Sequence, residues 1–160
     1  MIKRNGLNTL EVNSPTTTDE SCGYEQSALR ELRSAGLRIT MPRVQVIRTL
    51  ANSKRSLTAY EVHEQIIQTG GKIDVVSVYR ILATLEEIGL IHHIGLVNGY
   101  FPARVDDRAA KKSQVVVLNN DRAILELRIP QQMLDMIEEQ SRAHGFEAEV
   151  IKIEILASAT

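Results

Sequence analysis

The 160-residue sequence has a single cysteine, Cys22, and no tryptophan. One cysteine excludes an intrachain disulfide, a CxxC redox pair and a thiolate-rich zinc site built within one chain. Four prolines and nine glycines are too few for a collagen-like or low-complexity chain. No stretch reaches the ~18 apolar residues of a membrane span, and the N-terminus lacks the apolar region of a secretory signal. The sequence therefore predicts a folded cytoplasmic protein without a membrane segment.

Motifs of the common enzyme classes are also missing. The chain contains no GxSxG elbow, P-loop, HExxH zinc motif or GxGxxG dinucleotide motif. Cys22 lies in a polar N-terminal segment where no base is expected beside it, and Asp106 and Asp107 are neighbours in a polar linker. We therefore expect that the protein is not an enzyme.

Positive charge is concentrated in one part of the chain although the net charge is only −1. Between Arg30 and Arg55, seven cationic residues are opposed by Glu31 alone, whereas the stretch 135–154 is mainly acidic. A local basic patch on a near-neutral protein attracts phosphate groups to one place. The charge pattern favours a nucleic-acid-binding face, and an ordinary solvated helix face is the alternative that charge alone leaves open.

The first 105 residues predict a disordered arm, four helices and a hairpin. The arm is the polar segment 1–22. Apolar residues at helical spacing predict helices over 24–35, 41–52, from about 58 to 70, and from about 75 to 88. Thr40 is expected to cap the second helix, and Thr58 with Glu61 has the spacing of a capping box. Two β-prone runs, 90–96 and 100–105, flank a turn in which Gly99 is expected to adopt positive φ.

A second, smaller unit is predicted after a polar hinge. The hinge is 106–113, and the residues that follow predict a hairpin (114–118 with 123–127), a helix from Pro130 to Gly145, and a strand over 147–156. So short a unit does not cover its own apolar surface comfortably, so we expect it to pair with a second copy. The predicted fold class is α+β, with a winged helix-turn-helix domain at 23–105 and a small α/β dimerisation domain at 114–160.

The helical region contains the segments AGLRITMPRVQVIRTL (35–50), LTAYEVHEQI (57–66) and VVSVYRILATLEEIGLI (75–91). These three segments closely resemble the DNA-binding domain of Fur-type (ferric uptake) metal regulators. Ile124–Leu127 and Arg142–Gly145 extend the resemblance to about 28–156. The resemblance implies a sequence-specific transcriptional regulator, expected to act as a repressor, that binds double-stranded DNA as a homodimer at an inverted repeat.

Five residues are the predicted DNA contacts: Arg38, Arg43, Ser77, Tyr79 and Arg80. Outward positions near the start of a recognition helix face the major groove, where Ser77 can hydrogen-bond, Tyr79 can contact thymine methyls and Arg80 can bind guanine or phosphate. Arg43 is placed to bind phosphate, and Arg38 resembles the family's basic residue that enters an A·T-rich minor groove. Core packing of Tyr79 and an ion pair of Arg80 with a later glutamate are the alternatives. Weaker candidates are Arg48, Lys54 and Arg55.

The metal ligands of the resembled family are mostly replaced here. Its His-rich stretch corresponds to Ala109–Gln114, and its CxxC positions correspond to Val117 and Asn120. The remaining donors are His92, His93, Glu126 and His144, and zinc or iron are the cofactors they could take. We expect DNA binding without a transition metal. The alternatives are a zinc- or iron-dependent repressor with an unrecognised site, and a winged-helix interaction module that binds no DNA.

Overall fold

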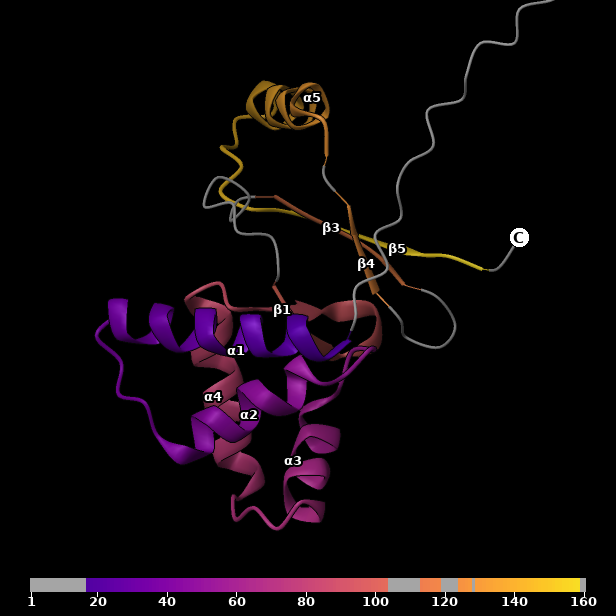
Figure 1. Ribbon diagram of the computed structural model, residues 1–160. Coiled ribbons are helices and arrows are strands. Elements are labelled where there is room, and N and C mark those ends of the chain that lie inside the picture. Colours follow the sequence, from indigo (N-terminus) through magenta and orange to yellow (C-terminus); the bar gives the residue numbers. More distant parts are fainter. Residues whose placement is uncertain (1–16, 104–112, 119–123, 128, 159–160) are drawn as a thin grey trace, which may run out of the picture.

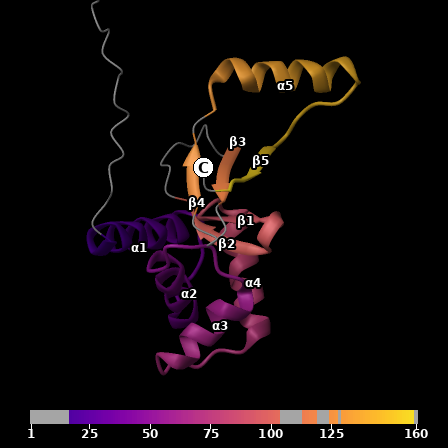
Figure 2. The same cartoon turned by 90° about the vertical axis from the view of Figure 1, so that its right-hand side faces the viewer.

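The structure is a computed structural model that describes residues 17–103, 113–118, 124–127 and 129–158 (Figure 1). Residues 17–103 form a helical body that ends in a two-stranded hairpin, and a three-stranded sheet with one helix lies beyond that hairpin (Figures 1 and 2). This arrangement confirms the predicted α+β class. In chain order the elements are α1 (Thr17–Ser34), α2 (Met41–Ala51), α3 (Ala59–Gln68), α4 (Val75–Glu87), β1 (Ile91–Ile94), the 3₁₀ helix η1 (Gly95–Val97), β2 (Gly99–Pro102), β3 (Ser113–Leu118), β4 (Ile124–Leu127), α5 (Gln131–Ala143) and β5 (Ile151–Leu156).

One apolar core holds the four N-terminal helices together. Each helix contributes residues at intervals of three or four, which places them on a single face. The fully buried side chains include Leu32 of α1, Ile47 and Leu50 of α2, Ile66 of α3, and Leu82 and Leu85 of α4. Burial of each such side chain is worth ~1.5–3 kcal/mol, so the core fixes how α4 is presented to solvent.

Helix α1 begins earlier than the sequence predicts. It starts at Thr17, so residues 17–22 of the expected arm are helical, and residues 1–16 lie outside the described part of the chain. The helix is anchored because the Tyr24 hydroxyl donates to the Leu90 carbonyl oxygen at 2.5 Å.

The starts of the next three helices differ in how they are capped. Thr58 and Glu61 form the predicted capping box before α3. Thr40 precedes α2 as predicted but makes no side-chain capping hydrogen bond; Pro in the first turn favours that helix start instead. Asp74 caps α4 by accepting from the Ser77 backbone N–H at 2.8 Å.

The hairpin β1–β2, here called the wing, packs beside the helices. Its strands are antiparallel with Ile94 opposite Gly99, and Leu57 before α3 bridges to Tyr100. The positive φ that the sequence predicts for Gly99 is adopted by Asn98 instead (φ 46°). Asparagine tolerates this left-handed backbone conformation better than most residues do. Gly99 is required for a different reason: a Cβ there would lie 2.8 Å from Ser56 Cβ.

The C-terminal sheet has the order β4-β3-β5. The predicted hairpin β3–β4 is antiparallel, and β5 returns through α5 to pair parallel with β3. The turn 119–123 and all of the predicted hinge except Ser113 lie outside the described residues. Helix α5 has no buried residue within the chain. No helix among the described residues has the length and apolar character needed to cross a membrane.

Candidate nucleic-acid interface

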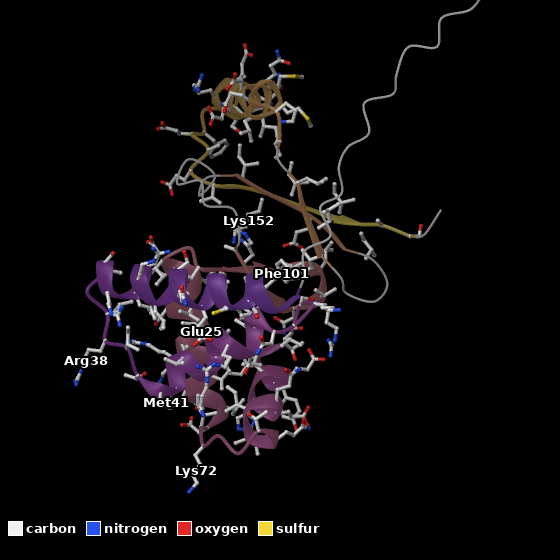
Figure 3. The ribbon with its side chains drawn as sticks, in the orientation of Figure 1. Glu25, Arg38, Met41, Lys72, Phe101 and Lys152 are labelled. Carbon is white, nitrogen blue, oxygen red and sulfur yellow. The ribbon has the colours of Figure 1, made fainter. Side chains whose placement is uncertain are left out.

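A basic hollow of about 580 Å³ lies between the loop before α2 and the start of α4. Four cationic side chains and only one carboxylate, Asp74, line it. The cations are Arg38, Arg43, Lys72 and Arg80. The labelled Arg38, Met41 and Lys72 all lie on the side of the helical body away from the C-terminal sheet (Figure 3). The hollow therefore brings together predicted contacts from two segments about forty residues apart in the sequence, Arg38 and Arg43 from one and Ser77 and Arg80 from the other. Lys72 adds a fourth cation to the same hollow.

Arg38 and Arg43 are brought together at the start of α2. Arg43 Nη1 donates to the Arg38 carbonyl oxygen at 2.5 Å, which holds the loop against the helix. The Arg38 side chain is exposed and extends away from the body (Figure 3). Neither guanidinium forms an ion pair within the described part of the chain, so both charges are available to an outside anion.

Ser77 lies at the rim of the hollow, but its hydroxyl already has a partner. Ser77 Oγ donates to Asp74 Oδ2 at 2.6 Å, and the Ser77 N–H donates to Asp74 Oδ1. These hydrogen bonds from Ser77 lower the pKa of the Asp74 carboxyl, which is therefore ionised at neutral pH. The Ser77 oxygen can still accept a hydrogen bond, so we expect it to meet a donor on a base edge more readily than a phosphate.

Tyr79 and Arg80 lie on the outer face of α4. Tyr79 is 51% exposed, which rules out the alternative that it is a core residue. Arg80 is exposed and has no ion pair with any described residue, while Glu86 pairs instead with Lys152. Both side chains are thus free to meet a ligand.

Two other arginines of the basic stretch, Arg48 and Arg55, form ion pairs. Arg48 Nη2 lies 2.8 Å from Glu25 Oε1, and Arg55 Nη1 lies 3.0 Å from Glu61 Oε1. The hydrogen bond from Arg48 holds the pKa of Glu25 below its ordinary value. Arg48 thus links α2 to α1, and Arg55 links the turn before α3 to that helix. Because both side chains already have partners, they are weaker candidates for DNA contacts.

Sequence reasoning missed three residues of this face. Lys72, exposed in the loop before α4, lines the hollow, and Met41 (67% exposed) and Val76 (54% exposed) are large apolar side chains at the starts of α2 and α4. The Lys72 loop is held because a His63 ring nitrogen lies 3.0 Å from the Ile73 carbonyl oxygen. Position was the available signal: Lys72 lies three positions before the start of the predicted recognition helix.

The candidate metal donors do not converge among the described residues. His93 Nε2 lies 3.1 Å from Asn98 Oδ1, with its ring against Tyr100, and His144 is exposed at the end of α5. The Glu126 side chain lies outside the described part of the structure. No group of three or more His, Cys, Asp or Glu side chains that could hold a metal is present in the described residues. Those residues therefore do not fit the donor set that tight zinc or iron binding needs.

Known proteins resemble this chain over most of its length. The sequence model of the "Ferric uptake regulator family" matches residues 34–156. A ferric uptake regulation protein of Brucella abortus is 29% identical over 136 residues, covering 85% of this chain and 89% of that protein. The corresponding protein of Pseudomonas aeruginosa is 36% identical over 62 residues, but the match spans only 38% of this chain and about half (46%) of that protein.

A solved structure described as a zinc uptake regulator complexed with zinc and DNA has the same fold. It superposes with a TM-score of 0.78 at 18% identity, and the match covers 88% of this chain and 93% of that one. The superposition supports a winged-helix domain followed by a smaller sheet domain. The match of the family model over residues 34–156 shows that the chain belongs to the ferric uptake regulator family.

Proposed function

We propose that this protein is a sequence-specific DNA-binding transcriptional regulator that acts as a homodimer on an inverted repeat. The observation that carries the proposal is the basic hollow at the start of α4, where Arg38, Lys72 and Arg80 are exposed cations without ion pairs to described residues. In a winged helix, this end of the recognition helix enters the major groove. The family match and the DNA-bound relative support the same reading.

The proposed division of labour follows the two parts of the fold. The helices and wing, up to about residue 105, bind DNA: Arg38 reaches a minor groove, Arg43 and Lys72 bind phosphates, and Ser77, Tyr79 and Arg80 face bases. The unit from 114 onward dimerises. A regulator of this kind performs recognition without catalysis.

Exposed apolar side chains in the C-terminal unit support the homodimer. Helix α5 buries none of its residues within the chain, and the sheet exposes large side chains of its own. Apolar patches of this kind mark association surfaces, and a two-fold pairing covers both copies at once. The exposed residues include Leu125, Met133, Met136, Phe146, Val150 and Leu156.

Selection from random duplex DNA tests the function directly. The wild-type protein should enrich an inverted repeat whose half-sites are one helical turn or a multiple apart, and light scattering should give a dimer. Arg80→Ala should weaken binding to the selected site by ~1–3 kcal/mol per half-site. Lys54→Ala, which removes an exposed cation that follows the other end of α2, is the control and should bind as the wild type does.

Absence of any enriched DNA would refute the proposal and favour a winged-helix interaction module. Enrichment of a site without a dyad would retain DNA binding and refute the homodimer.

A further inference from the structure

The carboxylate of Glu154 joins the C-terminal sheet to the wing. Glu154 lies on β5, and its two oxygens accept hydrogen bonds from two successive backbone N–H groups of η1. Glu154 Oε1 lies 2.8 Å from the Gly95 nitrogen, and Oε2 lies 2.9 Å from the Leu96 nitrogen. Hydrogen bonds to an ionised acceptor are about twice as strong as neutral ones, so this contact is directional and strong for its size.

Two further contacts lie beside it. Lys152 Nζ lies 3.5 Å from Glu86 Oε1 at the end of α4. Lys152 and Glu154 are two positions apart on one strand, so both point from the same face of the sheet toward the helical body. Ile124 of β4 packs against Ile94 and Phe101, which are buried in the wing.

Together these contacts restrict how the two domains rotate against each other. Two come from β5 and one comes from β4, on the opposite edge of the sheet, so they do not lie on a single axis. Lys152 and Phe101 are seen where the sheet meets the wing (Figure 3). Leu57 also bridges to Tyr100 in the wing, so the position of the wing is fixed relative to the recognition helix by the helical body.

We infer that Glu154 is a positioning residue: with Lys152 and Ile124 it forms a clasp that sets the orientation of the DNA-binding domain on the dimerisation domain. The effect on DNA recognition rests on the proposed function, whereas the contacts between the two domains do not. The clasp consists of side-chain and backbone groups of the chain itself. In a dimer, fixing this orientation fixes the separation of the two recognition helices, and therefore which paired half-sites can be engaged together.

The chemistry of the clasp requires a carboxylate at position 154. Two N–H donors need two acceptor oxygens, and glutamate supplies both. Glutamine supplies one oxygen and would turn an NH₂ group toward the second donor, so Glu154→Gln should open the clasp almost as far as Glu154→Ala. Glu149→Gln is the matched control, because Glu149 is exposed and forms no hydrogen bond or ion pair with the described residues.

Distance measurement between the domains tests the clasp without DNA. In a Cys22→Ser background, spin labels at exposed Gln68 of α3 and Gln140 of α5 report the inter-domain separation in the full-length protein diluted with unlabelled chain. The wild type and Glu149→Gln should give one narrow distribution. Glu154→Ala and Glu154→Gln should raise the population outside that peak by on the order of tenfold. A broad wild-type distribution, or unchanged distributions in both variants, would overturn the inference.

DNA binding supplies the second readout. On the selected inverted repeat, Glu154→Gln should bind on the order of tenfold more weakly, whereas on a duplex with one half-site its affinity should match the wild type. An equal loss on both duplexes would show that Glu154 supports folding of the winged helix and would contradict a positioning role. If the wild type selects no DNA, the proposed function fails while the distance measurement still decides whether the clasp exists.

Discussion

Replacing Lys72 isolates the electrostatic contribution of the basic hollow. Lys72 is exposed, has no partner among the described residues and lies in a loop that is held by the His63 contact to Ile73. Lys72→Ala should therefore remove a charge without disturbing α4. The change also leaves in place Tyr79 and Arg80, the residues proposed to face bases.

The expected magnitude follows from counterion release. Each phosphate neutralised on duplex DNA contributes ~0.9 to the slope of log affinity against log salt, which at roughly 0.1 M salt is ~1.2 kcal/mol. A homodimer carries two copies of Lys72, so Lys72→Ala should flatten the slope by ~1.8 and weaken binding about sixtyfold at that salt concentration. Because phosphates are the same at every site, the loss should be equal for selected and random duplexes.

Fluorescence anisotropy titrations at several salt concentrations give both quantities. Lys54→Ala is the control: Lys54 is also an exposed lysine without a described partner, but it follows the other end of α2. An unchanged slope in Lys72→Ala would show that Lys72 contacts no phosphate. An equal loss in Lys54→Ala would show that overall charge, not the hollow, determines affinity.

Three other predictions concern base recognition, acid stability and metal. Tyr79→Ala should cost about 1–3 kcal/mol per half-site only where the selected site has thymine, with Tyr79→Phe close to wild type in competition assays; a uniform loss over all sequences would contradict base contact. Arg48 lowers the pKa of Glu25 from its ordinary 4.5. The contact between these two residues therefore stabilises the folded protein above that pH, and this stabilisation is lost as the pH falls through the lower pKa of Glu25 in the folded state. Urea denaturation should show Arg48→Ala destabilised by about 0.2–1 kcal/mol near neutral pH and not in acid; equal loss at both would refute the ion pair as cause. Gel shifts should be unchanged by chelator, and stoichiometric zinc or iron whose removal abolishes binding would disprove metal independence.

Local patterns predict the helical body well, and contacts between distant residues explain what they miss. Helical spacing identifies α2 to α4 because the same residues that repeat in sequence are buried in the core. Arg80 could be proposed as a DNA contact because it lies near the start of the predicted recognition helix. The sequence assigns the positive φ of the turn to Gly99, whereas Asn98 adopts it. Glycine is needed at position 99 for another reason, because a side chain there would clash with Ser56, more than forty residues away in the sequence.

The contacts at Glu154 lie beyond any local signal. Glu154 and Gly95 are 59 residues apart, and an alternating strand does not state which of its polar residues meets a backbone donor. Lys72 is missed for a milder reason: a single lysine in a loop has no pattern, and only the fold shows that it shares a hollow with Arg38 and Arg80.

The parallel pairing of β5 with β3 sets an order of assembly. The central strand β3 gains its second neighbour only when β5 returns through α5, whereas the helical body forms mainly through contacts between elements that follow each other in the chain. Pairing between strands that are distant in the sequence is slow, because the intervening chain must lose entropy in closing a loop before the strands can make contact. We therefore expect the winged helix to fold first during refolding and the sheet to follow. A chain released in between would hold a formed recognition helix with nothing to set its distance from a second copy.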